Sequence, residues 1–338
     1  MRPQVLICSY LQPELVDRLI ADVPEVDVIY RPELLPIPQF GADHWGVPRE
    51  LTQDQLNEWH GFLGQATIMF DFDWWQPAAW QQHSPRLEWI QATQAGVGAR
   101  AEAMGHTDGD VRITTAAGVH AKPLAEFALA GLLHFVRELP RLESQRRNQK
   151  WTNGSSRTLH GHKALIIGAG SIGREVAETL TFMGVACDGT TRGVRTLGEP
   201  FERSIRLEDC ELGNYDIVVL SCPLTDETVG LFSKQRISEM KRGALLVNLS
   251  RGPVVDQEAL VDSLAGGHLG GAILDVADPE PLPAGHPLWN APNLILSPHT
   301  AANVDAENAR LVELFTKNLH RYLSGEEMIN VFDARLGY

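Results

Sequence analysis

A glycine-rich turn between an apolar run and a helical run constrains the fold of this chain more than any other feature. In "ALIIGAGSIGREVAETL", Gly168, Gly170 and Gly173 have the spacing GxGxxG. Glycines alone would be a weak signal, but between a strand and a helix they are typical of a dinucleotide-binding βαβ unit. Gly168 then permits the tight turn, Gly170 lets the backbone approach a pyrophosphate, and Gly173 lets the helix pack on the strand. We expect free N–H groups near Ser171 and Ile172 to hold the phosphate oxygens.

The same alternation of short apolar runs with helical runs extends along the whole chain. It begins with "VLICSY", "VDVIY", "QATIMFDF" and "LEWIQAT", and it resumes after the glycine turn with "YDIVVLSCPL", "GALLVNLSRG", "GGAILDV" and "LILSPHTA". The later runs are apolar on both faces, as the strands of a covered parallel sheet must be. A length of 338 residues suits two domains. We therefore predict an α/β fold of two Rossmann-like domains with doubly wound parallel sheets.

Three connecting segments can also be assigned. Residues 31–51 are rich in Pro and aromatic residues and are expected to form a long loop. A long helix is predicted from Lys122, kinked or broken at Pro140. The chain after His299 is expected to form one helix and a tail.

Composition excludes several classes of partner. The 43 Asp plus Glu outnumber the 29 Lys plus Arg, for a formal net charge of -14, so nucleic-acid and membrane partners are not expected. The four cysteines lack CxxC spacing, and neither a metal site nor a disulfide framework is predicted. No run approaches the roughly 20 apolar residues of a membrane span, and the N-terminal apolar run is too short for a signal peptide. We expect a soluble cytoplasmic protein.

The segment "CDGTTRGVR" decides which ribose the dinucleotide carries. Asp188 lies 20 residues after Gly168 but only 15 after Gly173, so the spacing alone does not decide whether it is the acid that binds a ribose 2′-OH. The predicted strand covers about 186–191, however, so that its carboxyl end belongs to Thr191 and Arg192 and leaves Asp188 in mid-strand, partly exposed. A hydroxyl beside a guanidinium suits a 2′-phosphate. We predict NADP in preference to NAD, which remains an alternative, with Arg195 as a further candidate ligand.

Charged residues follow three of the later strands. These are Arg251 in "VNLSRGPVVD", Asp275, Asp278 and Glu280 in "AILDVADPEPL", and His299 in "LILSPHTAAN". An Arg, a carboxylate and a His near a dinucleotide indicate hydride transfer coupled to proton transfer. The Arg would bind a substrate carboxylate, the His would exchange a proton, and an acid would orient the His.

At this point the chain resembles the D-isomer-specific 2-hydroxyacid dehydrogenases, which include glyoxylate/hydroxypyruvate reductases. The resemblance covers nearly the whole chain, through "LEWIQATQAGVG", "GAGSIG", "CPLTDETVGLF", "NLSRGPVVD", "LDVADPEPLPAGHPLW" and "SPHTA". It implies a substrate domain formed by residues 1–117 and 305–338, interrupted by a nucleotide domain at 118–304. It also implies reversible reduction of a small 2-oxo acid to a D-2-hydroxy acid, and a homodimer formed through the helix near 122–138.

Roles follow from this resemblance position by position. Arg251 is expected to bind the substrate carboxylate and carbonyl, His299 to be the general acid/base and Glu280 its partner, with Asp278 ranked second. Backbone N–H groups around Gly96 and Val97 would hold the other side of the carboxylate. Besides the glycine loop, the expected cofactor contacts come from Cys222, Pro223, Thr228, Leu249, Asp275 and His299.

The chain departs from the family pattern at three places. Ala277 and Asp278 stand where an aromatic residue and Glu are frequent, Gly98 stands where Asp is frequent, and Thr191 replaces the acidic ribose ligand. The aromatic run 70–80 either lines a pocket for a bulky substrate or belongs to the core. An alternative function is a dinucleotide-sensing, corepressor-like binding protein on the same fold, and the side chain of the substrate stays open.

Overall fold

The chain forms two compact units, which the computed structural model describes over residues 2–105, 111–191 and 196–334. One unit is discontinuous and comprises Met1–His120 with Asn303–Tyr338, and the other is continuous and comprises Ala121–Ala302. We call them the discontinuous unit and the central unit. The chain therefore passes from one unit to the other twice, after His120 and after Ala302.

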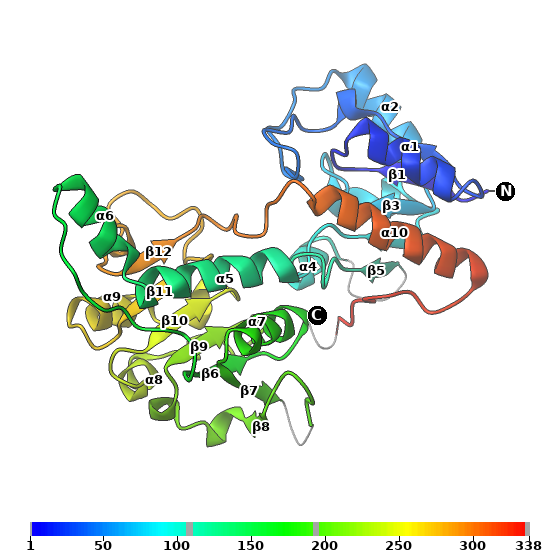
Figure 1. The fold of residues 1–338 in the computed structure, drawn as a ribbon. Coiled ribbons are helices and arrows are strands. Elements are labelled where there is room, and N and C mark those ends of the chain that lie inside the picture. Colours follow the sequence, from blue (N-terminus) through cyan, green and yellow to red (C-terminus); the bar gives the residue numbers. More distant parts are fainter. Residues whose placement is uncertain (1, 106–110, 192–195, 335–338) are drawn as a thin grey trace. The chain divides into compact units, whose positions relative to one another are not determined.

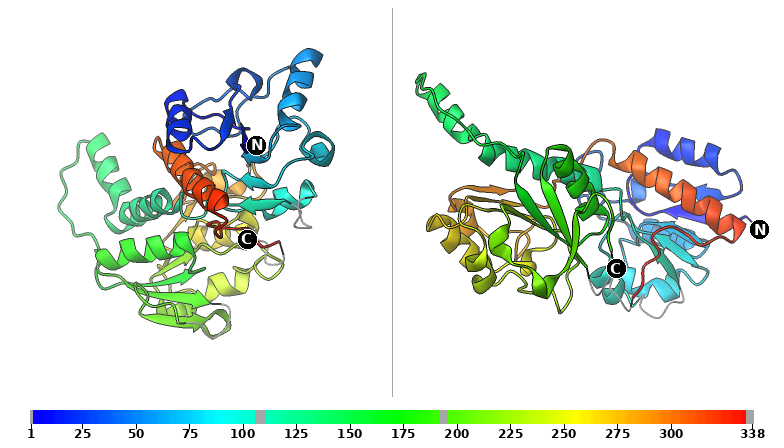
Figure 2. Two further views of the ribbon diagram at one scale, coloured as in Figure 1. Left: turned by 90° about the vertical axis from the view of Figure 1, so that its right-hand side faces the viewer. Right: turned by 60° about the horizontal axis from the view of Figure 1, so that its bottom comes forward.

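The discontinuous unit is built on a five-stranded parallel sheet with strand order β2-β1-β3-β4-β5. Its strands are β1 (Gln4–Ile7), β2 (Asp27–Ile29), β3 (Ile68–Phe70), β4 (Trp89–Gln91) and β5 (Arg112–Thr114). Its helices are α1 (Pro13–Asp22), α2 (Gln53–Leu63), α3 (Trp80–His83), α4 (Gly98–Ala103) and α10 (Glu307–Ser324). Helices α1 and α10 lie side by side (Figure 1; Figure 2). The C-terminal helix thus completes the unit that the N-terminal residues begin.

The central unit is built on a seven-stranded parallel sheet with strand order β12-β11-β10-β9-β6-β7-β8. Its strands are β6 (Lys163–Ile167), β7 (Ala186–Thr191), β8 (Arg203–Arg206), β9 (Ile217–Leu220), β10 (Leu245–Asn248), β11 (Gly271–Leu274) and β12 (Leu294–Leu296). Its helices are α5 (Ala121–Val136), α6 (Leu139–Arg147), α7 (Ser171–Phe182), α8 (Lys234–Glu239) and α9 (Gln257–Ala265). The strand order reverses between β6 and β9, which is where doubly wound sheets bind their ligands.

Both faces of the central sheet are covered, because the strands in its middle, β6, β9, β10 and β11, are buried along almost their whole length. Along β6, Leu165 and Ile167 belong to one buried cluster, and Ala164 and Ile166 belong to another. Residues of α8 and α9 pack in the first cluster, and residues of α5 and α7 pack in the second. Figure 1 shows α5 and α7 side by side over one face. The predicted fold class of two parallel-sheet α/β domains is confirmed.

The structure differs from the sequence-based prediction in two short strands. β5 and β8 were not predicted, since each contains a single apolar residue. The expected break near Pro140 is present: α5 ends at Val136, Glu138 has φ 52°, and α6 begins at Leu139. Among the described residues, no helix combines the length and apolar character that crossing a membrane requires.

Candidate active site

The glycine turn after β6 has the geometry that its three glycines were expected to provide. Gly168 has φ 98°, and a Cβ there would lie 2.5 Å from the backbone nitrogen of Cys222. A Cβ on Gly173 would lie 2.1 Å from the Gly168 carbonyl oxygen. A Cβ on Gly170, in contrast, would meet nothing within 4 Å. Protein packing therefore accounts for Gly168 and Gly173, whereas Gly170 leaves open space at the start of α7, where a phosphate would approach the helix N–H groups.

The neighbouring strand supports this turn. The Oγ1 of Thr190 accepts a hydrogen bond from the Gly168 backbone N–H at 3.3 Å, and Ser221 Oγ donates to the Gly168 carbonyl oxygen at 2.8 Å. β7 ends at Thr191, the residue expected at the ribose. Arg192 and Arg195, the other expected ligands of a 2′-phosphate, lie outside the described residues.

The prediction that Asp188 is partly exposed is wrong. Asp188 is only 5% exposed. Its carboxylate accepts three hydrogen bonds from Arg203, two from Nε and one from Nη2 at 2.6 Å, and one from the Tyr215 hydroxyl at 2.8 Å. The Arg203 side chain itself is 63% exposed, so it covers Asp188 from the solvent side. Burial, followed by the hydrogen bond to Asp188, raises the pKa of Tyr215 well above its usual value. Asp188 is thus committed to a structural network in mid-strand.

Arg251 is held on a tight turn directly after β10. Asn248 shapes this turn, since its Nδ2 donates to the Arg251 carbonyl oxygen at 3.1 Å and its Oδ1 accepts from the Ser250 N–H at 3.0 Å. Gly252 allows close packing, because a Cβ there would lie 1.9 Å from the Ala277 carbonyl oxygen. The turn that carries Arg251 is therefore packed directly on the segment that leads to Glu280.

Glu280 and His299 form a hydrogen-bonded pair. The Nδ1 of His299 lies 2.8 Å from Glu280 Oε2, while Glu280 Oε1 accepts the Ala277 N–H at 3.0 Å. The backbone of Asp278, the other acid considered, instead bonds to the Gln257 side chain: its N–H donates to Gln257 Oε1, and its carbonyl oxygen accepts from Gln257 Nε2. The two side chains of the pair are 43% and 38% exposed. The pair therefore remains open to solvent on one side.

Asp275 fixes the turn that presents His299. Its carbonyl oxygen accepts the His299 N–H at 2.8 Å, and its Oδ1 accepts the Ser297 hydroxyl at 2.8 Å and the Ala301 N–H at 2.9 Å. His299 itself has φ 59°, a left-handed conformation that few residues other than glycine adopt. Strained backbone of this kind is frequent at functional sites.

Burial and charge act in opposite directions on the three ionisable groups. Burial lowers the pKa of Arg251, against the attraction of Glu280 and Asp275, and it raises the pKa of Asp275. Burial also opposes ionisation of Glu280, but the hydrogen bonds from His299 and Ala277 outweigh it and lower the Glu280 pKa. Glu280 is thus held as a carboxylate facing the imidazole.

The remaining predicted cofactor residues follow other strands of the same sheet. The segment after β9 contains Cys222, Pro223 and Thr228, and the Thr228 hydroxyl donates to the Pro223 carbonyl oxygen at 2.7 Å. Leu249 follows β10 and is buried. Since all seven strands are parallel, these segments, the glycine turn, Arg251, Asp275 and His299 lie at one edge of the sheet.

Gly96 and Val97 belong to the discontinuous unit. They stand between β4 and α4, where Gly96 is exposed and Val97 is fully buried. Much of the aromatic run 70–80 belongs to the core of this unit, since Phe70 and Phe72 are buried there. Trp151, which belongs to the central unit, is 98% exposed.

Sequence reasoning missed three residues that shape this site. Asn248 and Ser297 hold the turns of Arg251 and His299, and Thr190 supports the glycine turn. Each is a short polar residue within two or three positions of a strand end, the place where side-chain bonds to backbone are frequent. That position is the signal that could have indicated them.

Comparison of the chain with known proteins agrees with the fold and the site described above. The model of the D-isomer specific 2-hydroxyacid dehydrogenase NAD binding domain matches residues 129–301. A glyoxylate reductase/hydroxypyruvate reductase of Mus musculus is 33% identical over 230 residues, 64% of this chain and 69% of the relative.

Two solved structures match over almost the entire chain. A D-isomer specific 2-hydroxyacid dehydrogenase family protein of Aeromonas salmonicida has a TM-score of 0.80 and 27% identity over 99% of this chain and 100% of its own. A D-isomer specific 2-hydroxyacid dehydrogenase of Xanthobacter autotrophicus, in complex with NADPH and MES, has a TM-score of 0.77 and 28% identity, with full coverage of both chains. The chain belongs to the D-isomer specific 2-hydroxyacid dehydrogenase family.

Proposed function

We propose that the protein reduces a small 2-oxo acid to the D-2-hydroxy acid, using NADPH in preference to NADH. The observation that carries the proposal is the His299–Glu280 pair at 2.8 Å, which shares the carboxyl edge of one parallel sheet with Arg251 and the glycine turn. A proton donor, a carboxylate-binding cation and a dinucleotide turn at one sheet edge are the parts that carbonyl reduction requires. The mouse relative, named glyoxylate reductase/hydroxypyruvate reductase, supports the same substrate class.

The residues after β6 fit a dinucleotide. Gly170 leaves room where a Cβ would otherwise stand, and the first N–H groups of the 12-residue helix α7 begin there. Ser171 and Ile172 would hold the pyrophosphate, and the segments after β9, β10 and β11 would hold the nicotinamide half. A reduced nicotinamide dinucleotide supplies, when bound, the hydride that the substrate carbonyl carbon receives.

The chain's own residues would move the proton and hold the charge. Arg251 binds the carboxylate and the carbonyl oxygen of the substrate. The backbone N–H groups near Gly96 and Val97 are the further expected donors to the carboxylate. His299 donates the proton from Nε2 to the carbonyl oxygen as the new C–H bond forms. Glu280 accepts the Nδ1–H of His299, which orients the ring and stabilises its charged form. In the reverse direction, His299 takes the hydroxyl proton.

A panel of 2-oxo acids tests the reaction. Glyoxylate, hydroxypyruvate and a larger apolar 2-oxo acid are each offered with NADPH, and the product is separated by chiral chromatography. We expect turnover on at least one of them, with the D-isomer as the only chiral product. Tight NADPH binding without turnover on any member would instead support the dinucleotide-sensing binding protein.

The cofactor preference rests on the end of β7. Asp188, the acid with the spacing of a ribose ligand, is occupied by Arg203 and Tyr215. Thr191 ends the strand, and Arg192 follows it in the sequence. A guanidinium at that point would favour a 2′-phosphate. We expect a higher kcat/KM for NADPH than for NADH, and a clear NADH preference would contradict this.

We also propose that the protein is a homodimer formed through α5. Phe127, Leu129 and Leu133 on this helix are only partly buried, which leaves apolar surface for a second copy. Size-exclusion chromatography with light scattering should give twice the mass of one chain. A cytoplasmic location stays a prediction from the sequence.

A further inference from the structure

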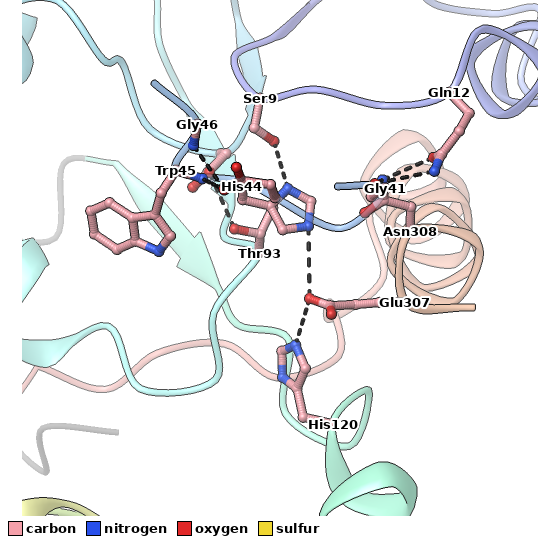
Figure 3. A network of polar contacts seen from close by, with 12 residues as sticks. Ser9, Gln12, Gly41, His44, Trp45, Gly46, Thr93, His120, Glu307 and Asn308 are labelled. Carbon is pink, nitrogen blue, oxygen red and sulfur yellow. Dashed lines mark hydrogen bonds and ion pairs between the residues drawn. The ribbon is translucent and has the colours of Figure 1, made fainter. Parts of the chain in front are cut away.

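A second His–Glu cluster lies in the discontinuous unit, and none of its residues has a role in the proposed reaction so far. Glu307 Oε1 lies 3.1 Å from His120 Nε2 and 3.7 Å from His44 Nε2, and His44 Nδ1 lies 3.1 Å from Ser9 Oγ. Figure 3 shows Glu307 between the two imidazoles, at the start of α10. The side chains of His44, His120 and Glu307 are 7%, 14% and 5% exposed. All three side chains are thus largely buried, and we call this group the sealed cluster.

The cluster joins the two places where the chain passes between the units. His120 is the last residue of the discontinuous unit before α5, and Glu307 follows closely after the chain returns at Asn303. The hydrogen bond between them spans 187 residues of sequence. The Glu307 carboxylate therefore links the segment by which the chain leaves the discontinuous unit (115–122, the exit segment) to the segment by which it returns (301–309, the re-entry segment).

The same end of α10 also fastens a long loop. Asn308, the next residue, donates from Nδ2 to the Gly41 carbonyl oxygen at 2.7 Å, and Gln12 donates to the same oxygen at 3.1 Å. His44 lies in this loop, which an antiparallel bridge between Ile37 and Val47 closes. At the start of α10, Asn308 thus hydrogen-bonds to the 37–47 loop, and Glu307 lies 3.7 Å from His44 of the same loop.

The loop continues to the segment expected to bind the substrate carboxylate. Next to His44, the Trp45 ring lies 5.2 Å from the Arg100 guanidinium, measured to the ring centroid. Arg100 is in α4, directly after Gly96 and Val97. The contacts therefore extend from the start of α10 through the 37–47 loop to α4.

A helix start does not by itself explain a buried carboxylate here. An acid in the first turn of a helix gains about 0.3–1 kcal/mol from the helix dipole, and it can do so while exposed. Burying a charge costs more than this unless hydrogen-bond partners compensate. Glu307 Oε2 and His44 Nε2 nonetheless have no hydrogen-bond partner among the described residues. The compensation is incomplete, so the buried position of Glu307 calls for another cause.

We propose that Glu307 is a positioning residue for the proposed reaction: it locks the exit segment, the re-entry segment and the 37–47 loop into one fixed arrangement. The two segments are the covalent connections between the units, and Glu307 stiffens both of them within the discontinuous unit. Glu307 touches no reacting atom in this assignment. The expected effect of Glu307 on turnover rests on the proposed function. Its expected effect on the stiffness of the three segments rests only on the contacts of the cluster.

The charged and titratable groups around the cluster bear on the test. His44 faces Asp71, Glu307, His120 and Asp43, and burial lowers its pKa, with the acids opposing that effect. His44 is therefore mainly neutral at neutral pH, and Glu307 keeps His120 as its close partner. Experiments at pH 7.5 then compare one protonation state of His44 in all variants.

The test compares Glu307→Gln with wild type and with Glu313→Gln. Gln keeps the size of Glu and removes the charge, and Glu313 is a control on the same helix that pairs with Lys317 at the surface. Hydrogen exchange is measured over residues 115–122, 301–309 and 37–47, together with kcat, the KM for NADPH and the Kd for NADPH. We expect faster exchange in all three segments and a kcat lower by about tenfold. The KM and Kd for NADPH should be unchanged, since the glycine turn belongs to the other unit.

The conservative variant Glu307→Asp adds a readout that a merely structural residue would not give. A shorter carboxylate that still reaches one histidine should restore part of kcat, with thermal stability similar to that of Glu307→Gln. If Glu307→Gln does not fold, His120→Leu, whose side chain forms no hydrogen bond, removes the same bond from the other side and takes its place. Wild-type exchange in all three segments of the folded variant overturns the proposal.

The exchange measurement also separates this proposal from the proposed function. If the wild type binds NADPH and turns over no 2-oxo acid, the proposed function fails and the exchange rates still decide the role of Glu307 in stiffness. If turnover is normal in Glu307→Gln while exchange is faster, the positioning role in the reaction is refuted.

Discussion

The chain contains two His–Glu clusters with the same chemistry and opposite surroundings. His299 and Glu280 are 2.8 Å apart and 43% and 38% exposed, while Glu307 and its histidines are all at most 14% exposed. In the first, Glu280 engages one nitrogen of the ring, and the ring remains accessible. In the second, one carboxylate lies between two rings within the protein.

This difference shows why the same pair of residues can serve different purposes. Proton transfer requires a ring nitrogen that a substrate can reach, so only the open pair is suited to it. A sealed pair can exchange a proton only with its own neighbours, and its value lies in fixing the segments that carry it. The assignments of His299 to chemistry and of Glu307 to positioning follow from exposure as much as from residue type.

The largest effect is expected for His299→Asn. Asn tolerates the left-handed backbone of this position better than most residues, so the turn should be retained. Loss of the general acid should lower kcat by roughly 10²–10⁴-fold. Steady-state kinetics on the best 2-oxo acid measure this, and His286→Asn is the control because Asn can still cap the turn that His286 caps. Near-normal turnover in His299→Asn would contradict the role of His299 as the proton donor, and the open pair would then differ from the sealed cluster in exposure only.

A smaller loss is expected for Arg251→Lys. Lys keeps the charge but cannot offer two parallel donors to a carboxylate. Losing one charged hydrogen bond costs about 1.5–3 kcal/mol, so kcat/KM should fall by roughly 10–100-fold. The exposed Arg242→Lys on the loop before β10 serves as the control. Unchanged kcat/KM in Arg251→Lys would remove Arg251 from substrate binding.

The open site is also the part that the sequence could predict. Its residues follow strands directly, so an apolar run next to Arg251 or His299 is enough to place them at one sheet edge. The sealed cluster could not be predicted, because His120 and Glu307 are 187 residues apart and no local pattern links them.

Asp188 shows the same limit in the central unit. Its partners Arg203 and Tyr215 lie 15 and 27 residues further along the chain. Spacing from the glycines therefore suggested a ribose ligand, while strand position suggested an exposed residue, and neither indicates an ion pair. Strands β5 (RIT) and β8 (RSIR) escaped prediction because each contains a single apolar residue, which is too little hydrophobic pattern.

Asp188→Asn extends the comparison to another acid, which is buried in the central unit. The change removes the charge that Arg203 neutralises and should lower the free energy of unfolding by about 1–3 kcal/mol. The lower part of that range is expected, because Arg203 is largely exposed and solvent screens its charge. Denaturant unfolding measures the loss, and the exposed Asp209→Asn is the control. The ratio of kcat/KM for NADPH and NADH should not change, and a shift in that ratio would return Asp188 to the ribose.

The smallest effect concerns pH and the sealed cluster. Burial lowers the pKa of His44 in the folded chain below its ordinary value of 6.5, so the unfolded chain takes up this proton first as the pH falls. The stability that neutral His44 gives is complete above about pH 6.5 and is lost as the pH falls toward the folded-state pKa, by at most about 1.4 kcal/mol per pH unit. In His44→Gln, which can still bond to Ser9, the drop in unfolding free energy between pH 7.5 and 5.5 should be smaller than in wild type. The two proteins differ only at residue 44, so the difference between the two slopes isolates His44. Equal slopes for wild type and His44→Gln would mean that the sealed histidine ionises as freely as an exposed one, and the contrast between the two clusters would then rest on access alone.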